Sequence, residues 1–313
     1  MKKLLYATVA GLIATFSFAQ QELQFTQFMN NKLYYNPGVA GSSGSICINA
    51  VHRTQWAGFA NAPSTQNINA EIPIQILRGA LSVNITNDQI GFFQDIKFGL
   101  GYAYQMSLAN GTLGLGLSLD FINKGLTTGE WMPPDSGPDG AIGKFGSTDM
   151  KPELNFGAYY QSPTFYAGIS SRQLLATIST LDNNIGSVTQ IKNARNYFIM
   201  GGYNWNIPNT PITLKPAFLA KTDLEGPMQL DINVSALYNN KIWGGVSYRL
   251  QDAVAIMAGY YIMPDLRLSY SYDLTTSALR TASSGSHEIM LNYCFKIEIP
   301  PREKGYYRNP RFL

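Results

Sequence analysis

Charged side chains are scarce in this sequence. Lysine and arginine number 23 and aspartate and glutamate 20, so these four types make up 14% of the 313 residues, against about 25% in an ordinary soluble domain. The formal net charge is only +3. Disordered chains combine low hydrophobicity with a large net charge, and nucleic-acid-binding chains need a basic surplus to neutralise phosphates. The composition therefore argues against both classes, and we expect no nucleic-acid partner.

Imidazole groups are also nearly absent. The two histidines are His52 and His287. Ser286, His287 and Glu288 are consecutive, and neighbouring side chains of a strand point to opposite faces, so these three cannot form a catalytic triad together. The sequence has no G-x-S-x-G, H-E-x-x-H or phosphate-binding glycine loop, and the acidic stretch 135–140 lacks the spacing of a calcium loop. We therefore predict that the protein is not an enzyme and holds neither a metal nor an organic cofactor.

Long apolar runs are missing after the first twenty residues. No later stretch is apolar over the length that a membrane-spanning helix needs, which excludes helical spans. The first twenty residues differ, because Lys2 and Lys3 precede an apolar run over 4–18 and a small-x-small pattern, Ser17-Phe18-Ala19, closes it. This pattern predicts a secretory signal peptide over 1–19. The alternative is an N-terminal membrane anchor, which is disfavoured because the run is shorter than a span of about 20 residues.

Alternating polarity dominates the rest of the chain. In 228–238, apolar or aromatic side chains occupy nearly every second position, and glutamine, aspartate, asparagine and serine stand between them. Similar alternation occurs in 98–108, 113–121, 266–274 and 289–297. Successive side chains of a strand point to opposite faces, so each such strand has one apolar face and one polar or small face. Strands of about 9–11 residues with this pattern are typical of membrane barrels, and the mean hydropathy of −0.08 is the average of the two faces.

The alternation predicts an all-β fold, a transmembrane outer-membrane β-barrel of about 14 antiparallel strands. An even strand number is typical of single-chain bacterial barrels. Every second predicted connection is short, whereas the two longest, 124–152 and 174–194, are the fifth and the seventh. Outer-membrane barrels alternate short periplasmic turns with longer outer loops in this way. A secreted β-sandwich or propeller would explain the alternation but not the phased loops. The predicted strands cover 45–53, 66–75, 79–87, 96–109, 111–123, 153–161, 164–173, 195–206, 211–222, 228–239, 241–250, 253–262, 266–275 and 286–297.

Two further segments flank the predicted barrel over 45–297. Residues 20–44 alternate poorly but hold four aromatic side chains, so we predict a periplasmic plug that packs under or inside the barrel rather than a floppy leader. Residues 298–313 follow the last strand, lie in the periplasm if the strand number is even, and are basic and aromatic. We expect this tail to dock on a periplasmic partner rather than to form a disordered end, through Arg302, Tyr306, Tyr307, Arg308, Arg311 and Phe312.

Cysteine is almost absent, and its two positions are informative. Cys47 lies at the start of the first predicted strand and Cys294 near the end of the last. A closed barrel makes those strands antiparallel neighbours, and the periplasm permits disulfides. One interpretation is a disulfide across the seam, and the other is two unpaired side chains at different heights because of barrel stagger. Arg53 also has two interpretations, since it could pair with Glu71 of the second strand or be solvated independently in a wet lumen.

Five short blocks stand in order from the mature N-terminus to the last strand. They are 24–29 (QFTQFM), 33–41 (LYYNPGVAG), 52–66 (beginning HRTQWAGF), 87–91 (NDQIG) and 285–289 (GSHEI). As a group they resemble the PorP/SprF family of outer-membrane proteins of the type IX secretion system in Bacteroidetes, with Gly38 where that family usually has alanine. The resemblance implies plug and partner-contact roles for Gln24, Phe25, Gln27, Asn36, Pro37, Gly41, Arg53, Gln55, Trp56, Gly58, Pro63, Asn87, Asp88, Gly91, His287 and Glu288. Asn87, Asp88 and Gly91 also suit a turn between strands.

The resemblance implies a component of type IX secretion and gliding motility. Such a protein would help to deliver or hold secreted surface proteins such as gliding adhesins, and would contact the periplasmic ring of the machine. Outer loops would hold the cargo, while the plug and the tail would face the ring, and outer-membrane lipid would surround the barrel. An alternative from another class is a small-molecule uptake channel similar to fatty-acid transporters, which are also plugged barrels.

Overall fold

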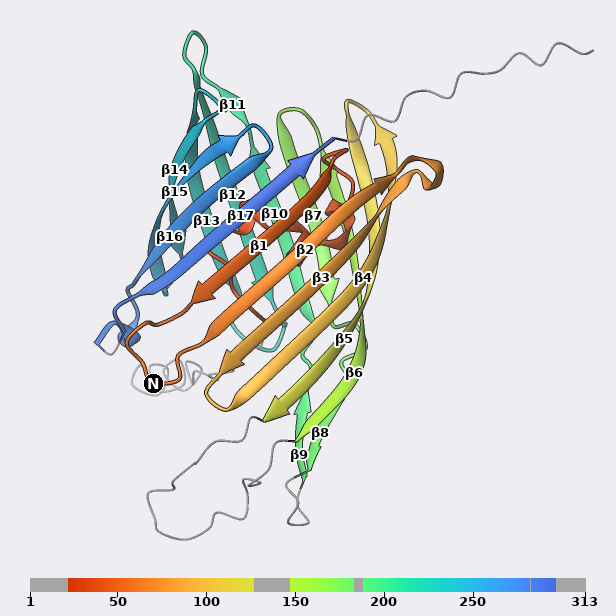
Figure 1. The fold of residues 1–313 in the computed structure, drawn as a ribbon, viewed down its shortest axis with the longest axis vertical. Coiled ribbons are helices and arrows are strands. Elements are labelled where there is room, and N and C mark those ends of the chain that lie inside the picture. Colours follow the sequence, from red (N-terminus) through yellow and green to blue (C-terminus); the bar gives the residue numbers. More distant parts are fainter. Residues whose placement is uncertain (1–21, 127–146, 183–187, 282, 297–313) are drawn as a thin grey trace, which may run out of the picture.

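The chain folds into a closed barrel of antiparallel strands (Figure 1). The computed structural model describes residues 22–126, 147–182, 188–281 and 283–296. The main sheet has 15 strands, with β17 paired to β1 and β10 paired to β12; the two-residue β11 (Trp205–Asn206) is a continuation beside β12, so 14 strands make the wall. The predicted 14-stranded barrel is confirmed. The wall consists of β1 (Ile46–Thr54), β2 (Ser64–Ile74), β3 (Gly79–Ile90), β4 (Phe93–Leu108), β5 (Gly111–Leu126), β6 (Thr148–Gln161), β7 (Phe165–Arg172), β10 (Asn196–Tyr203), β12 (Ile212–Thr222), β13 (Gln229–Tyr238), β14 (Ile242–Arg249), β15 (Ala253–Met263), β16 (Leu266–Thr275) and β17 (Ser286–Phe295).

Alternating side chains give each strand a lipid face and a luminal face. In β13, Ile232 is 47% exposed and Val234 52%, whereas Asn233 between them is 0% exposed. The same alternation of exposed apolar and buried polar residues recurs around the wall. In a membrane barrel the outward band is apolar and the interior is polar, so the two-residue period determines which side chains meet lipid. Among the described residues, no helix is long and apolar enough to cross a membrane.

The two ends of the barrel differ. At one end, called here the short-turn end, β4 and β5 or β6 and β7 are joined by two or three residues. At the other, the long-loop end, β5 and β6 extend further than predicted, and β6 begins at Thr148 rather than at 153. A hairpin that the sequence analysis missed, β8 (Ile178–Asp182) paired with β9 (Val188–Lys192), also stands at this end, at the lower edge of Figure 1. β1 runs from the short-turn end to the long-loop end, and successive wall strands alternate in direction.

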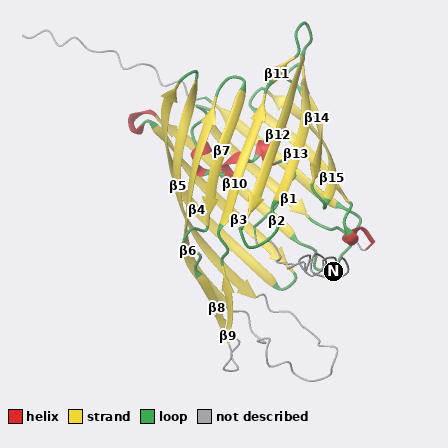
Figure 2. Cartoon of the chain, turned by 180° about the vertical axis from the view of Figure 1, so that it is seen from behind, coloured by secondary structure: helices red, strands yellow, loops and turns green. Residues whose placement is uncertain are grey.

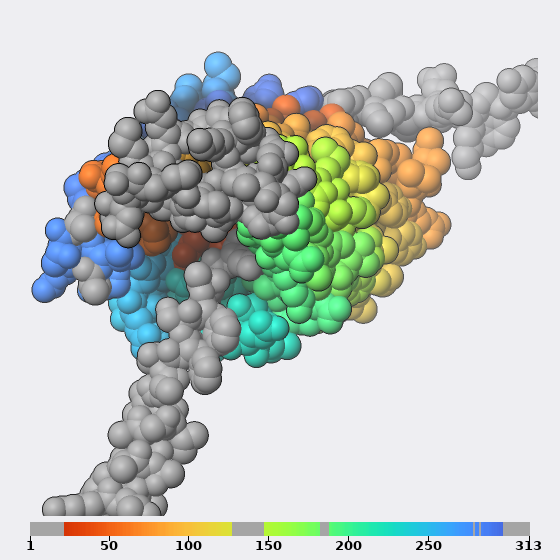
Figure 3. All heavy atoms as spheres, turned by 90° about the horizontal axis from the view of Figure 1, so that it is seen from below, coloured from red at the N-terminus to blue at the C-terminus, as the bar shows by residue number. Residues whose placement is uncertain are grey.

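The segment before β1 lies inside the barrel. Residues 22–45, called here the plug, contain the short helices η1 (Phe28–Asn30), α2 (Lys32–Tyr35) and η2 (Pro37–Val39). Figure 2 shows these helices in red between the strands, and Figure 3 shows plug atoms, also red, within the ring of wall strands at the long-loop end. The plug ends at the short-turn end, where it enters β1. The predicted signal peptide over 1–19 and the tail over 298–313 lie outside the described residues.

Candidate functional site

The plug bridges opposite walls of the barrel through a buried aromatic cluster. The ring centroids of Phe25 and Tyr34 are 4.9 Å apart, and those of Tyr34 and Tyr35 are 5.1 Å apart, both edge to face. Tyr35 also meets Phe198 of β10, with centroids 5.4 Å apart. Residues of β1, β6, β12 and β17 complete the cluster. Each such aromatic pair contributes about 0.5–1.5 kcal/mol beyond its buried area, so the cluster holds the plug in the centre of the lumen.

An ion cluster holds the start of the plug in the long-loop half. Oε1 of Glu22 lies 2.8 Å from Nη1 of Arg172 at the end of β7, and Oε2 lies 3.7 Å from Nζ of Lys97 in β4. Nη2 of Arg172 is 3.2 Å from Oδ2 of Asp120, and the hydroxyl of Tyr34 donates to Glu22. Glu22 and Arg172 are almost fully buried. Buried charges are tolerated when each is paired and hydrogen-bonded, as they are here.

A second cluster surrounds Arg53 at the end of β1. Its Nη2 lies 2.8 Å from Oδ2 of Asp273, and its Nη1 lies 3.2 Å from Oε2 of Glu288. Nη1 also donates to the hydroxyl of Thr26 at 2.7 Å. The backbone N–H groups of Thr26 and Gln27 both donate to Glu288, at 2.8 and 2.9 Å. One carboxylate of the wall therefore holds plug backbone and balances a buried arginine at the same time.

Both interpretations of Arg53 are wrong, since this buried side chain neither pairs with Glu71 nor is solvated independently. Glu71 is the register partner of Cys47, six positions before Arg53 on β1, which at about 3.3 Å per residue is roughly 20 Å. Glu71 instead binds the other end of the plug, accepting from the backbone N–H of Gly41 at 3.1 Å and from the hydroxyl of Ser43 at 2.7 Å. Arg53 and Glu71 both face the lumen, but the alternation within a strand does not tell how far along the barrel axis each side chain lies.

A third arginine extends the ionic network around the wall. Nε of Arg249 lies 3.1 Å from Oδ1 of Asp231, and its Nη1 lies 3.4 Å from Oδ2 of Asp252 and 3.3 Å from Oδ2 of Asp273. Asp273 is therefore shared by Arg249 and Arg53. The charged side chains of the long-loop half form a belt of alternating sign, and the polar groups of the plug complete it.

The Asn36-Pro37-Gly38 block docks onto the wall formed by β4 to β7. The side-chain oxygen of Asn36 accepts from the N–H of Gly38 at 2.8 Å, which caps η2. Its Nδ2 donates to the backbone carbonyls of Ala158 at 3.0 Å and Ile169 at 3.2 Å. One amide side chain thus closes the local turn and ties it to two wall strands.

Small residues on the wall make this docking possible. A Cβ added at Gly116 would lie 2.3 Å from the carbonyl carbon of Pro37, and one added at Gly157 would lie 2.0 Å from Oδ1 of Asn36. Distances this short leave no room for a side chain. Gly114 and Gly116 of β5 thus form part of the seat of the plug, a role that the alternation of 113–121 does not predict.

The seam of the barrel is crossed by a covalent bond. Cys47 and Cys294 are register partners in β1 and β17, and their sulfur atoms form a disulfide. The bond lies at the short-turn end on the luminal side. Of the two interpretations that the sequence left open, the structure has the bonded one. Within the described residues, no group of three or more histidine, cysteine, aspartate or glutamate side chains could hold a metal ion.

The sequence matches one family description over most of its length. The family description that fits the chain is "Type IX secretion system membrane protein PorP/SprF", and it matches residues 17–293. The chain belongs to the PorP/SprF family. The family is one of membrane proteins of the type IX secretion system. No curated protein matches the sequence.

Solved outer-membrane barrels share the fold of this PorP/SprF protein at low sequence identity. The CymD monoaromatic hydrocarbon channel is 11% identical, with a TM-score of 0.50 over 81% of this chain and 88% of that one. Omp33 of Acinetobacter baumannii is 10% identical, with a TM-score of 0.46 over 81% of this chain and 99% of that one. At such identities the likeness concerns the fold alone.

The family block after β1 forms a loop at the long-loop end. The N–H of Gln55 donates to the carbonyl of Pro63 at 2.9 Å, which closes the loop at its base. The N–H of Trp56 donates to the hydroxyl of Ser286 at 3.0 Å, so the loop is tied to the start of β17. Trp56 and Gly58 both have positive φ, 54° and 98°. Glycine adopts such a φ without strain, which explains the residue type at position 58.

The block over 87–91 differs from its prediction. Asn87 and Asp88 were expected in a turn, but both lie within β3, and only Gly91, with φ of 60°, is in the turn before β4. Asn87 Nδ2 donates to Gln66 at 2.6 Å, and Asp88 accepts from the hydroxyl of Thr65 at 2.5 Å. Both bonds join β3 to β2. The side chains of Asn87 and Asp88 therefore have hydrogen-bond partners within the sheet, although both residue types favour turns.

The remaining predicted residues are divided between lumen and exterior. Gln27 accepts from the hydroxyl of Ser269 at 2.6 Å, and Nδ1 of His287 lies 2.6 Å from the hydroxyl of the outward-facing Tyr270. His287 therefore faces away from the lumen, whereas its neighbour Glu288 faces the plug. Gln24 is partly buried in the plug, and its amide nitrogen has no hydrogen-bond partner among the described residues. The predicted docking residues of the tail lie outside the described residues.

Proposed function

We propose that this PorP/SprF protein is a non-enzymatic scaffold of the type IX secretion machinery, which delivers or holds secreted surface proteins. Its family supports a place in type IX secretion. The observation that carries the scaffold role is the filled lumen, in which Asn36 is bonded to β6 and β7 and Arg53 joins the plug to β1, β16 and β17. A barrel whose interior is cross-linked in this way is suited to present its ends rather than to conduct cargo.

The long-loop end is proposed to face outward. Outer-membrane barrels place their longer loops outside and their short turns in the periplasm. On this orientation, the loop of Trp56 and the β8–β9 hairpin lie at the cell surface. The end of the plug, the disulfide and the end of β17 then lie on the periplasmic side.

The β8–β9 hairpin is the proposed cargo contact. Its base is rigid, because the carboxylate of Glu153 accepts from the N–H groups of Thr177 at 2.7 Å and Leu175 at 3.2 Å. Its apolar side chains include Ile178, 47% exposed, and Val188, 58% exposed. Apolar side chains that extend beyond the membrane on a rigid support are suited to hold an extended partner.

The short-turn end is the proposed contact with the periplasmic ring. The sequence 298–313, with its arginine and tyrosine residues, follows β17, and the end of the plug lies at this same end of the barrel. Arginine and aromatic side chains are favoured in protein interfaces. On this proposal the tail binds the ring and the barrel transmits that attachment to the surface.

Small-molecule uptake is the second candidate function. A cavity of about 300 Å³ opens in the short-turn half of the lumen, and the fold is shared with a barrel described as a channel. The plug, however, fills the lumen beyond that cavity. Uptake would therefore require the plug to leave its seat.

Gene deletion with quantitative surface proteomics tests the scaffold proposal. Deletion should remove specific surface proteins from the cell surface, and the wild-type gene should restore them. A gene in which 177–193 is replaced by a short glycine-serine turn should insert in the membrane but fail to restore them. Unchanged surface proteins after deletion, together with lost uptake of a solute, would support the channel instead.

A matched control tests whether the effect is specific to the β8–β9 hairpin or common to any loop at this end of the barrel. Replacement of 224–227, an exposed loop at the same end, by a glycine-serine segment should leave surface retention unchanged. Pull-down with and without 298–313 tests the ring contact. Equal recovery of periplasmic proteins by both forms would overturn the role of the tail.

A further inference from the structure

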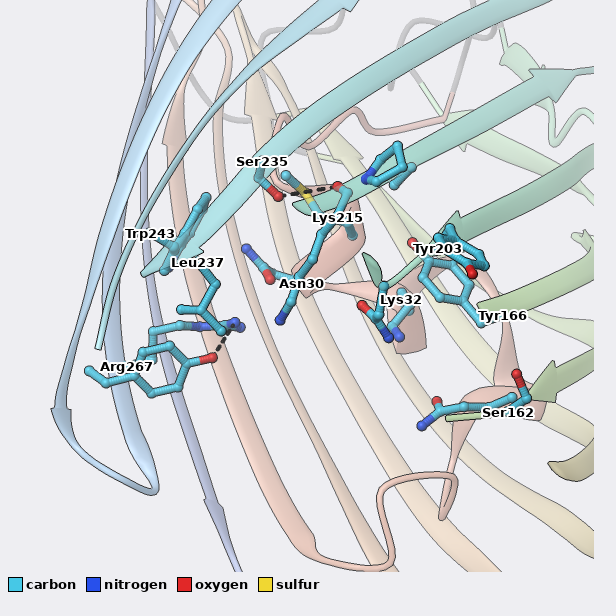
Figure 4. Close-up of a pocket in the computed structure, with 16 residues that line it drawn as sticks. Asn30, Lys32, Ser162, Tyr166, Tyr203, Lys215, Ser235, Leu237, Trp243 and Arg267 are labelled. Carbon is cyan, nitrogen blue, oxygen red and sulfur yellow. Dashed lines mark hydrogen bonds between the residues drawn. The ribbon is translucent and has the colours of Figure 1, made fainter. Parts of the chain in front are cut away.

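The cavity in the short-turn half has a wall that the scaffold role does not explain. It holds about 300 Å³ and is lined by Ser162 and Asn204 of short connections and by Met29 and Asn30 of the plug. Figure 4 shows Asn30 and Ser162 among the residues around it. Pockets that hold small ligands typically begin near 300 Å³. Its size therefore suits one small molecule.

The ionisable lining is entirely cationic apart from phenols. Lys32 of α2, Lys215 of β12 and Arg267 of β16 line the cavity, and no aspartate or glutamate does. Figure 4 shows the three cationic side chains entering the cavity from different elements. Elsewhere in the lumen the buried arginines are matched by carboxylates. Around this cavity the alternation of sign is absent.

Tyrosine hydroxyls and rings are the partners of Lys32 and Arg267, and Glu71 lines a neighbouring cavity together with Lys32. Nζ of Lys32 donates to the hydroxyl of Tyr159 at 2.8 Å and lies 4.2 Å from the ring centroid of Tyr166. Nη1 of Arg267 donates to the hydroxyl of Tyr261 at 3.4 Å. No carboxylate lies within ion-pair distance of any of the three in the described parts of the chain. Nearby cations without a counter-ion repel one another, so a bound anion stabilises the group.

Three residues that line the same cavity carry a hydrogen-bond donor without a partner among the described residues. Nε of Arg267, Nδ2 of Asn30 and Nε1 of Trp243 are buried with no partner among the described residues. All three atoms donate, and none can accept. A buried donor without an acceptor is destabilising. A carboxylate or phosphate in the cavity supplies both negative charge and strong acceptors.

The rest of the lining is apolar or aromatic. Met29, Leu237 and Trp243 contribute apolar surface, and Tyr166, Tyr203 and Tyr261 contribute rings. An inorganic ion would leave this surface unmatched. We propose that the cavity binds a small organic anion, in which a carboxylate or phosphate meets Lys32, Lys215 and Arg267 and an aromatic or short aliphatic body lies against the rings. The proposal does not rest on the secretion role.

Calorimetric titration of the full-length protein in a neutral detergent tests the proposal. The probes are 3-phenylpropionate, phenyl phosphate, the uncharged 3-phenylpropionamide and inorganic phosphate. At least one of the first two should bind, and the tighter one identifies the acidic group; the amide should bind at least 10-fold more weakly, since each lost charged hydrogen bond costs about 1.5–3 kcal/mol. Failure of both anions to bind, or equal binding of the amide, overturns the proposal. If inorganic phosphate binds as tightly as the better organic anion, the inference that the ligand has an organic body is overturned.

Single substitutions locate the binding. Lys215→Met and Arg267→Met should each weaken the better probe by roughly 10- to 100-fold, and Lys215→Arg should retain it. Lys241→Met is the matched control, because Lys241 is an exposed cation at the same end and does not line the cavity. If Lys215→Met does not fold, Lys215→Gln replaces it. Unchanged affinity in folded variants at both positions overturns the site.

Discussion

Oε1 of Glu22 lies 2.8 Å from Nη1 of Arg172, a residue 150 positions further along the chain. The contact joins the first described residue to the end of β7, in the middle of a buried cluster with Lys97 and Asp120. It therefore locks the start of the plug to the wall at a point remote from the covalent connection at Ser45.

Glu22→Gln should loosen the start of the plug. The substitution leaves Arg172 and Lys97 buried with less negative charge, and breaking a buried pair typically costs about 3–5 kcal/mol. Hydrogen exchange of residues 22–30 should rise, and the unfolding temperature should fall. Asp95→Asn is the control, because the Lys124–Asp95 pair is partly exposed, and such pairs contribute about 0–1 kcal/mol. Equal effects of the two substitutions would contradict the lock.

Gly116→Ala should displace the plug from its seat. The new Cβ would lie 2.3 Å from the carbonyl carbon of Pro37 and 2.4 Å from the nitrogen of Gly38, and backbone at that distance must move. Overpacking typically costs about 1–3 kcal/mol. Gly244→Ala is the matched control, since a Cβ there meets its nearest atom at 3.6 Å. Limited proteolysis of the plug is the measurement, and protection in both variants alike would count against the seat.

Arg53→Met and Glu71→Gln should have different effects. Arg53 balances Asp273 and Glu288, so its loss leaves two carboxylates buried together and should destabilise by about 3–5 kcal/mol. Glu71→Gln removes a charge but retains an acceptor for Gly41 and Ser43, so the loss should be smaller. Thermal unfolding of the two variants and of their combination measures the coupling. Strongly non-additive effects would indicate a direct contact between Arg53 and Glu71, which the strand register excludes.

Cys47→Ser should lower stability without opening the barrel. The disulfide crosses a seam at which β1 and β17 are paired along their whole length, from Ile46 with Phe295 to Thr54 with His287. Removal of a native disulfide typically costs about 2–4 kcal/mol, while the ladder keeps the strands together. Non-reducing peptide mapping of the wild-type protein should yield one peptide pair that joins Cys47 to Cys294. Two free thiols in that map would refute the bond.

Local patterning predicted most of the barrel wall. The two-residue period of β13 and β16 assigned their luminal and lipid faces, and β2 to β5 were found to within a few residues except where luminal polar residues extend the strand. β6 begins at Thr148 rather than at the predicted 153, because it pairs with β5 as far as Gly125. The β8–β9 hairpin was missed because its alternation is short and lies in a stretch assigned to a loop.

The interior could not be predicted to the same degree. Which luminal carboxylate meets Arg53 depends on height and rotation around the barrel, and neither is encoded in the period of a single strand. Asn87 and Asp88 have turn-forming chemistry, but partners on β2 satisfy them within a strand. The cationic cavity joins residues of α2, β12 and β16, so only closure of the barrel brings them together.

The course of the plug has a topological consequence. An even number of strands returns a chain to the side from which it started, yet the plug begins in the long-loop half of the lumen and ends at the short-turn end. It thus adds one more traverse without using a strand. An epitope fused directly before Glu22 and a second one placed after Phe295 are therefore expected to be accessible to antibodies from opposite faces of the membrane.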